Sequence, residues 1–242
     1  MKPLAVVQAR MGSSRLPGKV LADLGGETVL ARVVHRLSRA RSVQQIIVAT
    51  SISAKDDAVA YECDRLQVEC FRGSEHDVLD RYYRCADAFA PSAVVRITAD
   101  CPLIDPALVD LTIRAFEENT CDYASNALVP RYPRGLDVEV FTMSALARAW
   151  REASQPYERE HVTPYLYEHP DLFRLFSCQA EADYSHHRWT LDTAHDLELV
   201  RAIYARFGNQ HHFGWWEVLQ VLGNEPRLAL LNCHVVQKAV HA

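Results

Sequence analysis

The feature that most constrains the fold is an alternation of short apolar runs and longer amphipathic stretches in the first half of the chain. The apolar runs have the length of buried strands, and the stretches between them place apolar residues at helical spacing. The predicted strands are residues 4–7, 46–50 and 93–97, and the predicted helices are residues 28–41, 55–66, 76–89 and 106–118. This pattern predicts an α/β fold with a mostly parallel sheet and helices on both faces, which binds ligands beyond the carboxyl ends of its strands.

The rhythm changes after Asn119, where strands and helices no longer alternate strictly. The expected strands are residues 138–141, 173–178 and 188–191, and the expected helices are residues 144–153 and 194–207. No linker rich in Gly, Ser or Pro divides the 242 residues. The sequence therefore predicts one domain over residues 1–242, with an inserted antiparallel portion around residues 120–180 that serves as an acceptor lobe or a dimer contact.

Charge and cysteine content argue against several classes of protein. The chain has 26 basic and 31 acidic residues and a net charge of −5, whereas a nucleic-acid-binding protein needs an excess of Lys and Arg. The apolar run near the N-terminus is too short for a signal peptide or a membrane span. The seven cysteines form no Cys-x-x-Cys pair, which indicates neither a disulfide framework nor a zinc site and favours a cytoplasmic protein.

Pairs of adjacent aromatic residues are weaker signals. The histidine pairs at 186–187 and 211–212 are poor metal candidates, because neighbouring side chains diverge on a helix or strand, so we expect surface or loop positions. The pair Trp215-Trp216 could stack on a sugar. Since apolar residues follow it at helical spacing, we expect at least one ring to serve in packing or a dimer contact.

The segment from Arg10 to Lys19, directly after the first predicted strand, has the composition of an anion-binding loop. Gly12 and Gly18 let the backbone approach a ligand closely and adopt conformations that other residues avoid. Its three cations are accompanied by no acid, so the loop needs an anionic ligand, and a nucleoside triphosphate fits. The hydroxyl and cationic positions are Arg10, Ser13, Ser14, Arg15 and Lys19.

This loop differs from two common phosphate-binding motifs. Val20 follows Lys19 at the position where a P-loop has Ser or Thr. The spacing of its glycines also differs from that of a dinucleotide-binding fingerprint. The alternative that stays open is a solvated turn with surface charges.

Two aspartates are candidate metal ligands. Asp100 follows the predicted strand 93–97 and Asp192 follows the predicted strand 188–191, which places both at the functional edge of the sheet. Mg²⁺ prefers hard oxygen ligands and commonly uses one or two carboxylates together with substrate phosphates. Asp105 and Asp196 each stand at the start of a helical stretch, where an acid stabilises the helix end, and we expect them to be helix-associated.

Together these motifs resemble those of the cytidylyltransferases that activate sugars, including CMP-KDO and CMP-sialate synthetases, and most closely the SpsF-like (spore-coat polysaccharide) cytidylyltransferase family. The matching stretches are residues 8–19, 72–82, 96–104, 134–139, 159–163 and 191–197. The resemblance implies a three-layer α/β/α fold with a mostly parallel, mixed sheet, of the nucleotide-diphospho-sugar transferase type related to GT-A and Rossmann-like folds. It also implies a homodimer.

The resemblance further implies a reaction and the residues that serve it. CMP would pass from CTP to a sugar acid or sugar phosphate with release of pyrophosphate, Mg²⁺ would be the cofactor, and the product would enter surface glycan synthesis. The implied catalytic residues are Arg10, Arg15, Lys19 and Asp100, and the implied Mg²⁺ ligands are Asp100 and Asp192. The implied nucleotide-binding residues are Gln8, Ala9, Arg10, Gly12, Ser13, Ser14, Arg15, Lys19, Arg72, Ser74 and Asp77. The implied acceptor-binding residues are Arg134, Asp137, Glu139, Arg159 and His161.

Three alternatives compete with this interpretation. A glycosyltransferase of the related fold would consume a nucleotide sugar, but such enzymes usually carry an Asp-x-Asp motif that Ala99-Asp100-Cys101 lacks. A nucleotidyltransferase could use another nucleoside triphosphate, and a non-catalytic module could keep the fold alone. Within the favoured reaction, His161 or Glu139 could deprotonate an acceptor hydroxyl or only anchor it.

Overall fold

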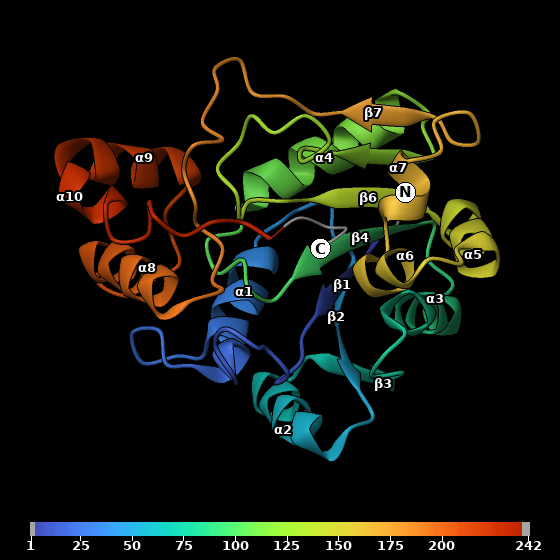
Figure 1. Ribbon diagram of the computed structural model, residues 1–242, viewed down its shortest axis with the longest axis horizontal. Coiled ribbons are helices and arrows are strands. Elements are labelled where there is room, and N and C mark those ends of the chain that lie inside the picture. The colour runs from blue at the N-terminus through green and yellow to red at the C-terminus, as the bar shows by residue number, and fades with distance from the viewer. Residues whose placement is uncertain (1–2, 239–242) are drawn as a thin grey trace.

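The computed structural model describes residues 3–238, and the strands in that range form one sheet (Figure 1). The seven strands of the described part are β1 (Pro3–Gln8), β2 (Gln45–Ser51), β3 (Glu69–Gly73), β4 (Ala93–Thr98), β5 (Tyr123–Ser125), β6 (Glu139–Thr142) and β7 (Leu175–Ser177). Their order is β3-β2-β1-β4-β6-β5-β7. Strand β6 runs antiparallel to β4 and β5, and the other neighbouring pairs are parallel, which confirms the mostly parallel, mixed sheet.

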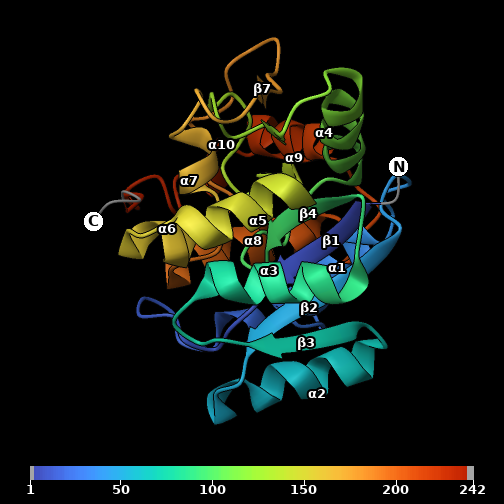
Figure 2. The ribbon, with the colours of Figure 1, turned by 90° about the vertical axis from the view of Figure 1, so that its right-hand side faces the viewer.

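Helices cover both faces of the sheet. They are α1 (Val29–Leu37), α2 (Asp57–Leu66), α3 (Val78–Phe89), α4 (Pro106–Glu118), α5 (Met143–Glu152), α6 (Pro156–His161), α7 (Pro164–Tyr167), α8 (Ala194–Arg206), α9 (Trp215–Asn224) and α10 (Pro226–Ala229), with 3-10 helices η1 (Lys19–Leu21) and η2 (Ala54–Asp56). Alternate residues of a strand face opposite sides, so Ala5 and Val7 pack with α1, α2 and α4, and Leu4 and Val6 with α3 and α5. Figure 2 shows α3 and α5 in front of the sheet and α1 behind it. The predicted three-layer α/β/α architecture is confirmed.

Side-chain caps fix the start of the helices that border the site. The Asp105 carboxylate accepts hydrogen bonds from the backbone of Ala107 and Leu108, and Pro106 begins α4. At α8, Thr193 and Asp196 form a capping box, in which each side chain accepts from the other residue's backbone N–H. Both aspartates are therefore helix-associated, as the sequence predicts.

The elements depart from the prediction in both halves of the chain. Residues 188–191 are not a strand, because they form only one isolated bridge, between Arg188 and Arg134, and the N–H of Leu191 donates to the carbonyl of Asp100 at 2.8 Å. Strand β3 was not predicted, because none of its residues is fully buried and its apolar pattern is weak. The role of residues 120–180 as an acceptor lobe or dimer contact stays a prediction.

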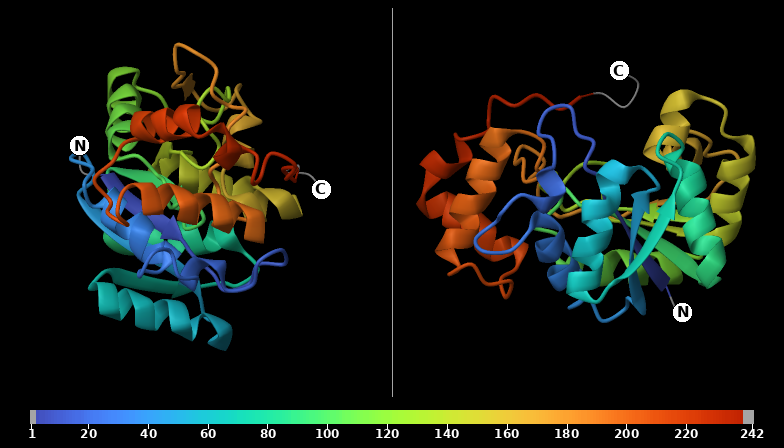
Figure 3. Two further views of the ribbon diagram at one scale, coloured as in Figure 1. Left: turned by 90° about the vertical axis from the view of Figure 1, so that its left-hand side faces the viewer. Right: turned by 90° about the horizontal axis from the view of Figure 1, so that it is seen from below.

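The C-terminal helices α8, α9 and α10 gather into a lobe beyond α1, at the opposite end of the molecule from α5–α7 (Figures 1 and 3). Its core includes Trp189, Tyr204 and Trp215, and Trp215 is 6% exposed whereas Trp216 is 54% exposed, so one ring packs as expected. Two buried arginines of α1 tie the lobe to the sheet by donating to its backbone carbonyls. Arg32 reaches Asn209, and Arg36 reaches His211 and Phe213. Across residues 3–238, no helix has the length and apolar character that crossing a membrane requires.

The cysteines form no disulfide, and the histidine pairs lie in loops as expected. All seven cysteines are free thiols, and both histidine pairs lie outside helices and strands. His211 does approach Glu27 and His35, with candidate ligand atoms within 4.8 Å of one another. The Arg32 guanidinium lies 3.2 Å from Glu27 and 3.1 Å from His211, so the position near these groups that a metal ion would take already has a positive charge beside it.

Candidate active site

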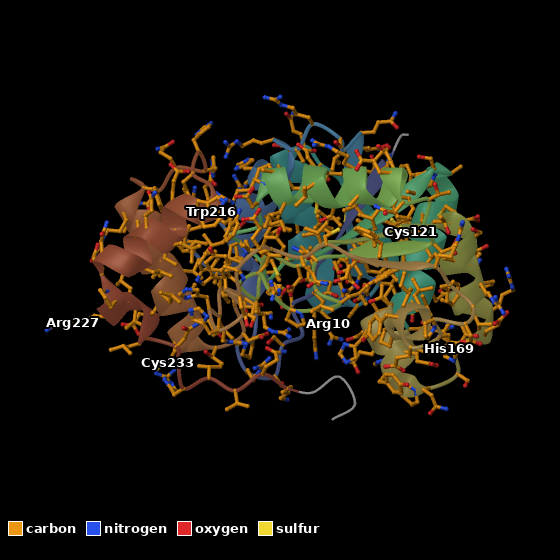
Figure 4. All side chains as sticks on the ribbon, turned by 90° about the horizontal axis from the view of Figure 1, so that it is seen from above. Arg10, Cys121, His169, Trp216, Arg227 and Cys233 are labelled. Carbon is orange, nitrogen blue, oxygen red and sulfur yellow. The ribbon has the colours of Figure 1, made fainter. Side chains whose placement is uncertain are left out.

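The loop that follows β1 borders two adjoining cavities at the carboxyl edge of the parallel strands. The loop cavity, about 320 Å³, is lined by the segment from Arg10 to Lys19, and the sheet cavity, about 600 Å³, extends from Asp100 to Asp137 and Glu139. The residues that line both are Arg15, Arg96, Thr98, Asp100, Glu160, His161, Asp192 and Lys238. Figure 4 shows Arg10 in the middle of the molecule, between the C-terminal lobe and the side that carries His169. The two cavities therefore form one continuous site.

Lys19 joins the loop to both candidate metal ligands. Its Nζ donates to Asp100 Oδ2 at 2.8 Å and to Asp192 Oδ1 at 2.8 Å, and the side chain is only 11% exposed. Burial alone would lower the pKa of Lys19, but the two carboxylates outweigh it and the pKa lies above its ordinary value. The fold thus brings together three charged residues that are far apart in the sequence.

Asp192 is held by three cations. Besides Lys19, Arg188 donates to its Oδ2 at 2.8 Å, and Arg15 lies 3.0 Å from the same oxygen. Burial would raise the pKa of Asp192, but these cations lower it below its ordinary value, and the carboxylate stays ionised at neutral pH. Arg188 also donates to Asp196 at 2.9 Å, so it connects Asp192 to the start of α8.

The donor set of Asp100 and Asp192 fits a hard divalent cation. Their two carboxylates converge on one cationic group, the Lys19 ammonium, beside a loop that can supply further positive charge to phosphates. Carboxylate oxygens next to a phosphate-binding loop are the ligands that Mg²⁺ prefers.

Glu139 lies in a buried network at the floor of the sheet cavity. It forms an ion pair with Arg96 and accepts hydrogen bonds from the hydroxyls of Tyr123 and Thr163, both at 2.6 Å. Arg96 extends the network to the side chain of Gln8 at 3.4 Å. This arrangement suits Glu139 for holding the cavity floor in place, and direct acceptor contact by Glu139 stays a prediction.

Asp137 has different surroundings in the same cavity. Burial raises its pKa, Arg134 opposes that rise, and the nearby charges of Glu139 and Asp100 add to it, so the pKa of Asp137 reaches about 6. Arg134 itself is exposed, at the border of the sheet cavity. His161 lines both cavities. The predicted acceptor residues Arg134, Asp137, Glu139 and His161 are therefore brought together.

The expected unusual backbone conformation is present at one loop glycine, Gly18, and absent at the other, Gly12. Gly18 has φ +70°, a left-handed conformation that favours glycine. The φ of Gly12 is not positive and a Cβ there would meet nothing within 4 Å, so the expectation that Gly12 needs an unusual backbone conformation is wrong. The other predicted loop residues lie where they can meet a ligand. Gln8, Arg10, Ser13 and Ser14 line the loop cavity, and Ala9 is buried behind it.

Besides Ala9, four predicted site residues line neither cavity. Arg72 donates to the carbonyls of Ser51 and Ser53 and pairs with Asp57. Arg159 forms a two-pronged pair with Asp77, at 3.1 and 2.5 Å, and Ser74 accepts from the N–H of Asp77. Arg72, Ser74, Asp77 and Arg159 thus make contacts within the protein, and their roles in binding nucleotide or acceptor stay predictions.

Several residues that border or support the site were missed in the sequence, among them Arg96, Arg188 and Lys238. Arg96 and Arg188 hold Glu139 and Asp192, and Lys238 lines both cavities from the far end of the chain. Arg188 stands four residues before Asp192 and eight before Asp196, a spacing that could have suggested a contact. Nothing in the sequence around Lys238 points to the site, since it follows the last helix and belongs to no motif.

Comparison with known proteins agrees with this geometry. A family model described as cytidylyltransferase matches residues 4–213. The spore coat polysaccharide biosynthesis protein SpsF of Bacillus subtilis is 35% identical over 233 residues, which cover 93% of this chain and 96% of that protein. A cytidylyltransferase structure from Leptospira borgpetersenii superposes with a TM-score of 0.90 at 34% identity, covering 95% and 97% of the two chains. The structure of CMP:2-keto-3-deoxy-manno-octonic acid synthetase complexed with CTP shares the fold, with a TM-score of 0.64 at 20% identity, covering 86% and 100%.

Proposed function

Because this chain belongs to the cytidylyltransferase family, we propose that it transfers CMP from CTP to a sugar acid or a sugar phosphate and releases pyrophosphate, with Mg²⁺ as its metal. Its relatives support the nucleotide. SpsF is named for polysaccharide biosynthesis, and the synthetase that shares the fold was solved with CTP. We further propose a cytoplasmic homodimer that serves surface glycan synthesis.

The observation that carries the proposal is the double contact of Lys19 with Asp100 and Asp192, both at 2.8 Å, at the junction of the two cavities. It places two carboxylates and a lysine next to a loop with two further cations, Arg10 and Arg15. A triphosphate carries about four negative charges and requires both kinds of group, since cations bind its oxygens and carboxylates hold its metal.

In this mechanism the chain binds and orients both reactants. Arg10, Arg15 and Lys19 neutralise the triphosphate and stabilise the charge that grows on the leaving pyrophosphate. The sheet cavity holds the acceptor, so that its oxygen faces the α-phosphorus across the junction of the cavities. Bound at Asp100 and Asp192, Mg²⁺ would supply Lewis-acid stabilisation of the phosphate oxygens.

An ionised sugar phosphate can attack without losing a proton, whereas the hydroxyl of a sugar acid must lose a proton during the attack. Asp137 and His161 both line the sheet cavity and can accept one. The structure favours neither over the other, and Glu139 is the weaker candidate because its ion pair and hydrogen bonds already engage its carboxylate.

The test is thermal unfolding with CTP, UTP, GTP or ATP, each with and without Mg²⁺. A ligand present at about a hundred times its Kd adds roughly 2.7 kcal/mol to the free energy of unfolding, a shift of a few degrees. We expect a magnesium-dependent shift with CTP, followed by pyrophosphate release when sugar acids and sugar phosphates are supplied. A shift with UTP or GTP alone would keep the reaction type but replace CTP as the proposed nucleotide substrate. A shift with only a nucleotide diphospho-sugar would overturn the proposal in favour of a glycosyltransferase.

A further inference from the structure

The segment after α10 returns from the C-terminal lobe to the middle of the molecule. Figure 1 shows it passing from α10 towards the carboxyl end of β4, and Figure 3 shows the same course from below. This segment, residues 232–238, is named the tail. It lies at the border of both cavities, because Gln237 lines the sheet cavity and Lys238 lines both.

Arg188 anchors the tail at both ends. The amide of Asn232 donates to the backbone carbonyl of Arg188 at 2.9 Å and to the Asp196 carboxylate at 2.8 Å. Five residues further on, the Gln237 side chain accepts from Arg188 Nη1 at 2.6 Å. Since Arg188 also donates to Asp192, one buried guanidinium sets the position of the tail relative to a candidate metal ligand.

The tail carries one cation to this place. Lys238 is exposed and forms no ion pair with any residue of the described range 3–238. Lys19, by contrast, is buried, and its ammonium is paired with two carboxylates. An exposed ammonium at the junction of two cavities can bind an anionic oxygen of a ligand, with little cost of desolvation before binding.

We propose that Lys238 binds the phosphate chain of the nucleotide at the end that faces the sheet cavity, opposite the loop of Arg10 to Lys19. This inference deepens the proposed function and rests on it. The position favours the nucleotide, because Lys238 shares the loop cavity with Arg10, Arg15 and Lys19. The loop after the first strand supplies cations on one side of the triphosphate. The tail would then supply a cation on the other side.

The test compares Lys238→Ala with Arg227→Ala, which removes a charge from the same C-terminal lobe. Arg227 is exposed on α10 and lies at the outer edge of the molecule, away from Arg10 (Figure 4). Binding of CTP and of inorganic tripolyphosphate is measured by calorimetry with Mg²⁺ over a range of salt concentrations. We expect Lys238→Ala to weaken both ligands about tenfold, which is the size of one charge-assisted contact, and to flatten the salt dependence. Lys238→Arg should retain most of the affinity.

The outcomes separate this inference from the proposed function. Equal affinities in Lys238→Ala and Arg227→Ala would overturn the role of Lys238. If the wild-type protein binds tripolyphosphate but not CTP, only the choice of CTP as the nucleotide is overturned. A loss confined to the KM of the acceptor would also overturn the inference, since the lysine would then meet the other substrate. Gln237→Ala removes one of the two anchors of the tail but keeps the lysine, and we expect a loss of about threefold in affinity. An unchanged affinity in that variant would refute anchoring through Gln237.

Discussion

Asp192 and Asp137 both line the sheet cavity, and burial raises the pKa of each, yet their final values lie on opposite sides of the ordinary one. Around Asp192 stand Lys19, Arg188 and Arg15, which lower its pKa. Around Asp137, burial is the largest cause of the raised pKa, Arg134 opposes it, and the charges of Glu139 and Asp100 add to the rise, so the pKa reaches about 6. Burial acts in the same direction on both carboxylates, and the cations around Asp192 reverse its effect whereas the acids near Asp137 add to it.

The difference divides the site into two regions. One region is built to hold fixed negative charge against cations, as a metal and a triphosphate require. The other region holds a carboxyl group that can take up or release a proton near neutral pH, as the chemistry of an acceptor hydroxyl requires. Substitutions in either region test this division.

The largest effect is expected from Asp192→Asn. An amide is a poor metal ligand and leaves three cations without their shared carboxylate, so pyrophosphate release should fall by about a thousandfold. The rate is measured with CTP and Mg²⁺ at saturating acceptor. Asp171→Asn, at an exposed position outside both cavities, is the matched control. A rate within a few-fold of wild type would mean that Asp192 holds neither metal nor phosphate-binding residues in place.

Next in size is the effect of Glu139→Gln on stability. The substitution leaves Arg96, which is 14% exposed, without its counter-charge, and such a loss costs about 3 kcal/mol. The free energy of unfolding is obtained from urea titrations, with exposed Glu181→Gln as the control. Since the variant also removes one of the charges that raise the pKa of Asp137, that pKa should move down towards its ordinary value. Stability equal to that of the control would show that the network contributes little to the fold.

A smaller effect is expected from Lys19→Ala. The variant loses a phosphate-binding cation and frees one side of Asp100 and Asp192, so kcat/KM for the nucleotide should fall about thirtyfold, or about 2 kcal/mol. Both a higher KM and a lower kcat are expected, because the contact serves bound triphosphate and leaving pyrophosphate alike. Unchanged kinetics would favour the alternative that the loop of Arg10 to Lys19 is a solvated turn with surface charges.

The sequence predicts the first region better than the second. The loop, Asp100 and the strands that carry them are local features, because an apolar run followed by a glycine or an aspartate places its own end at the sheet edge. Asp192 reaches the same place for another reason. The segment before it is no strand, and the backbone bond from Leu191 to Asp100 holds it there.

Long-range pairing of charges is what the sequence does not reveal. Arg159 and Asp77 were predicted to meet different ligands, yet they pair with each other, and nothing local distinguishes that pair from the many other combinations. The raised pKa of Asp137 is equally hidden from the sequence, since it depends on burial in the folded protein and on two acids from separate segments. Lys238 lies beyond every motif and follows Gln237, whose side chain accepts a hydrogen bond from Arg188.

The smallest expected effect is on the pH dependence of stability and tests Asp137 alone. Its pKa is raised from 3.8 to about 6 in the folded protein, so the folded state binds the proton more tightly than the unfolded state does. Between these values, the contribution of Asp137 to the free energy of unfolding falls as pH rises, by on the order of 1–2 kcal/mol for a partly exposed group. Asp137→Asn mimics the protonated form at every pH.

Comparing the two proteins cancels the titration of all other groups to a first approximation. The free energy of unfolding of Asp137→Asn minus that of wild type should be near its minimum at pH 4, rise through the window up to about pH 6, and level off above pH 7. Urea titrations of the ligand-free proteins at half-unit intervals give this difference directly. A difference that does not change with pH would mean that Arg134 offsets the neighbouring acids, and that both carboxylates of the site stay ionised at neutral pH.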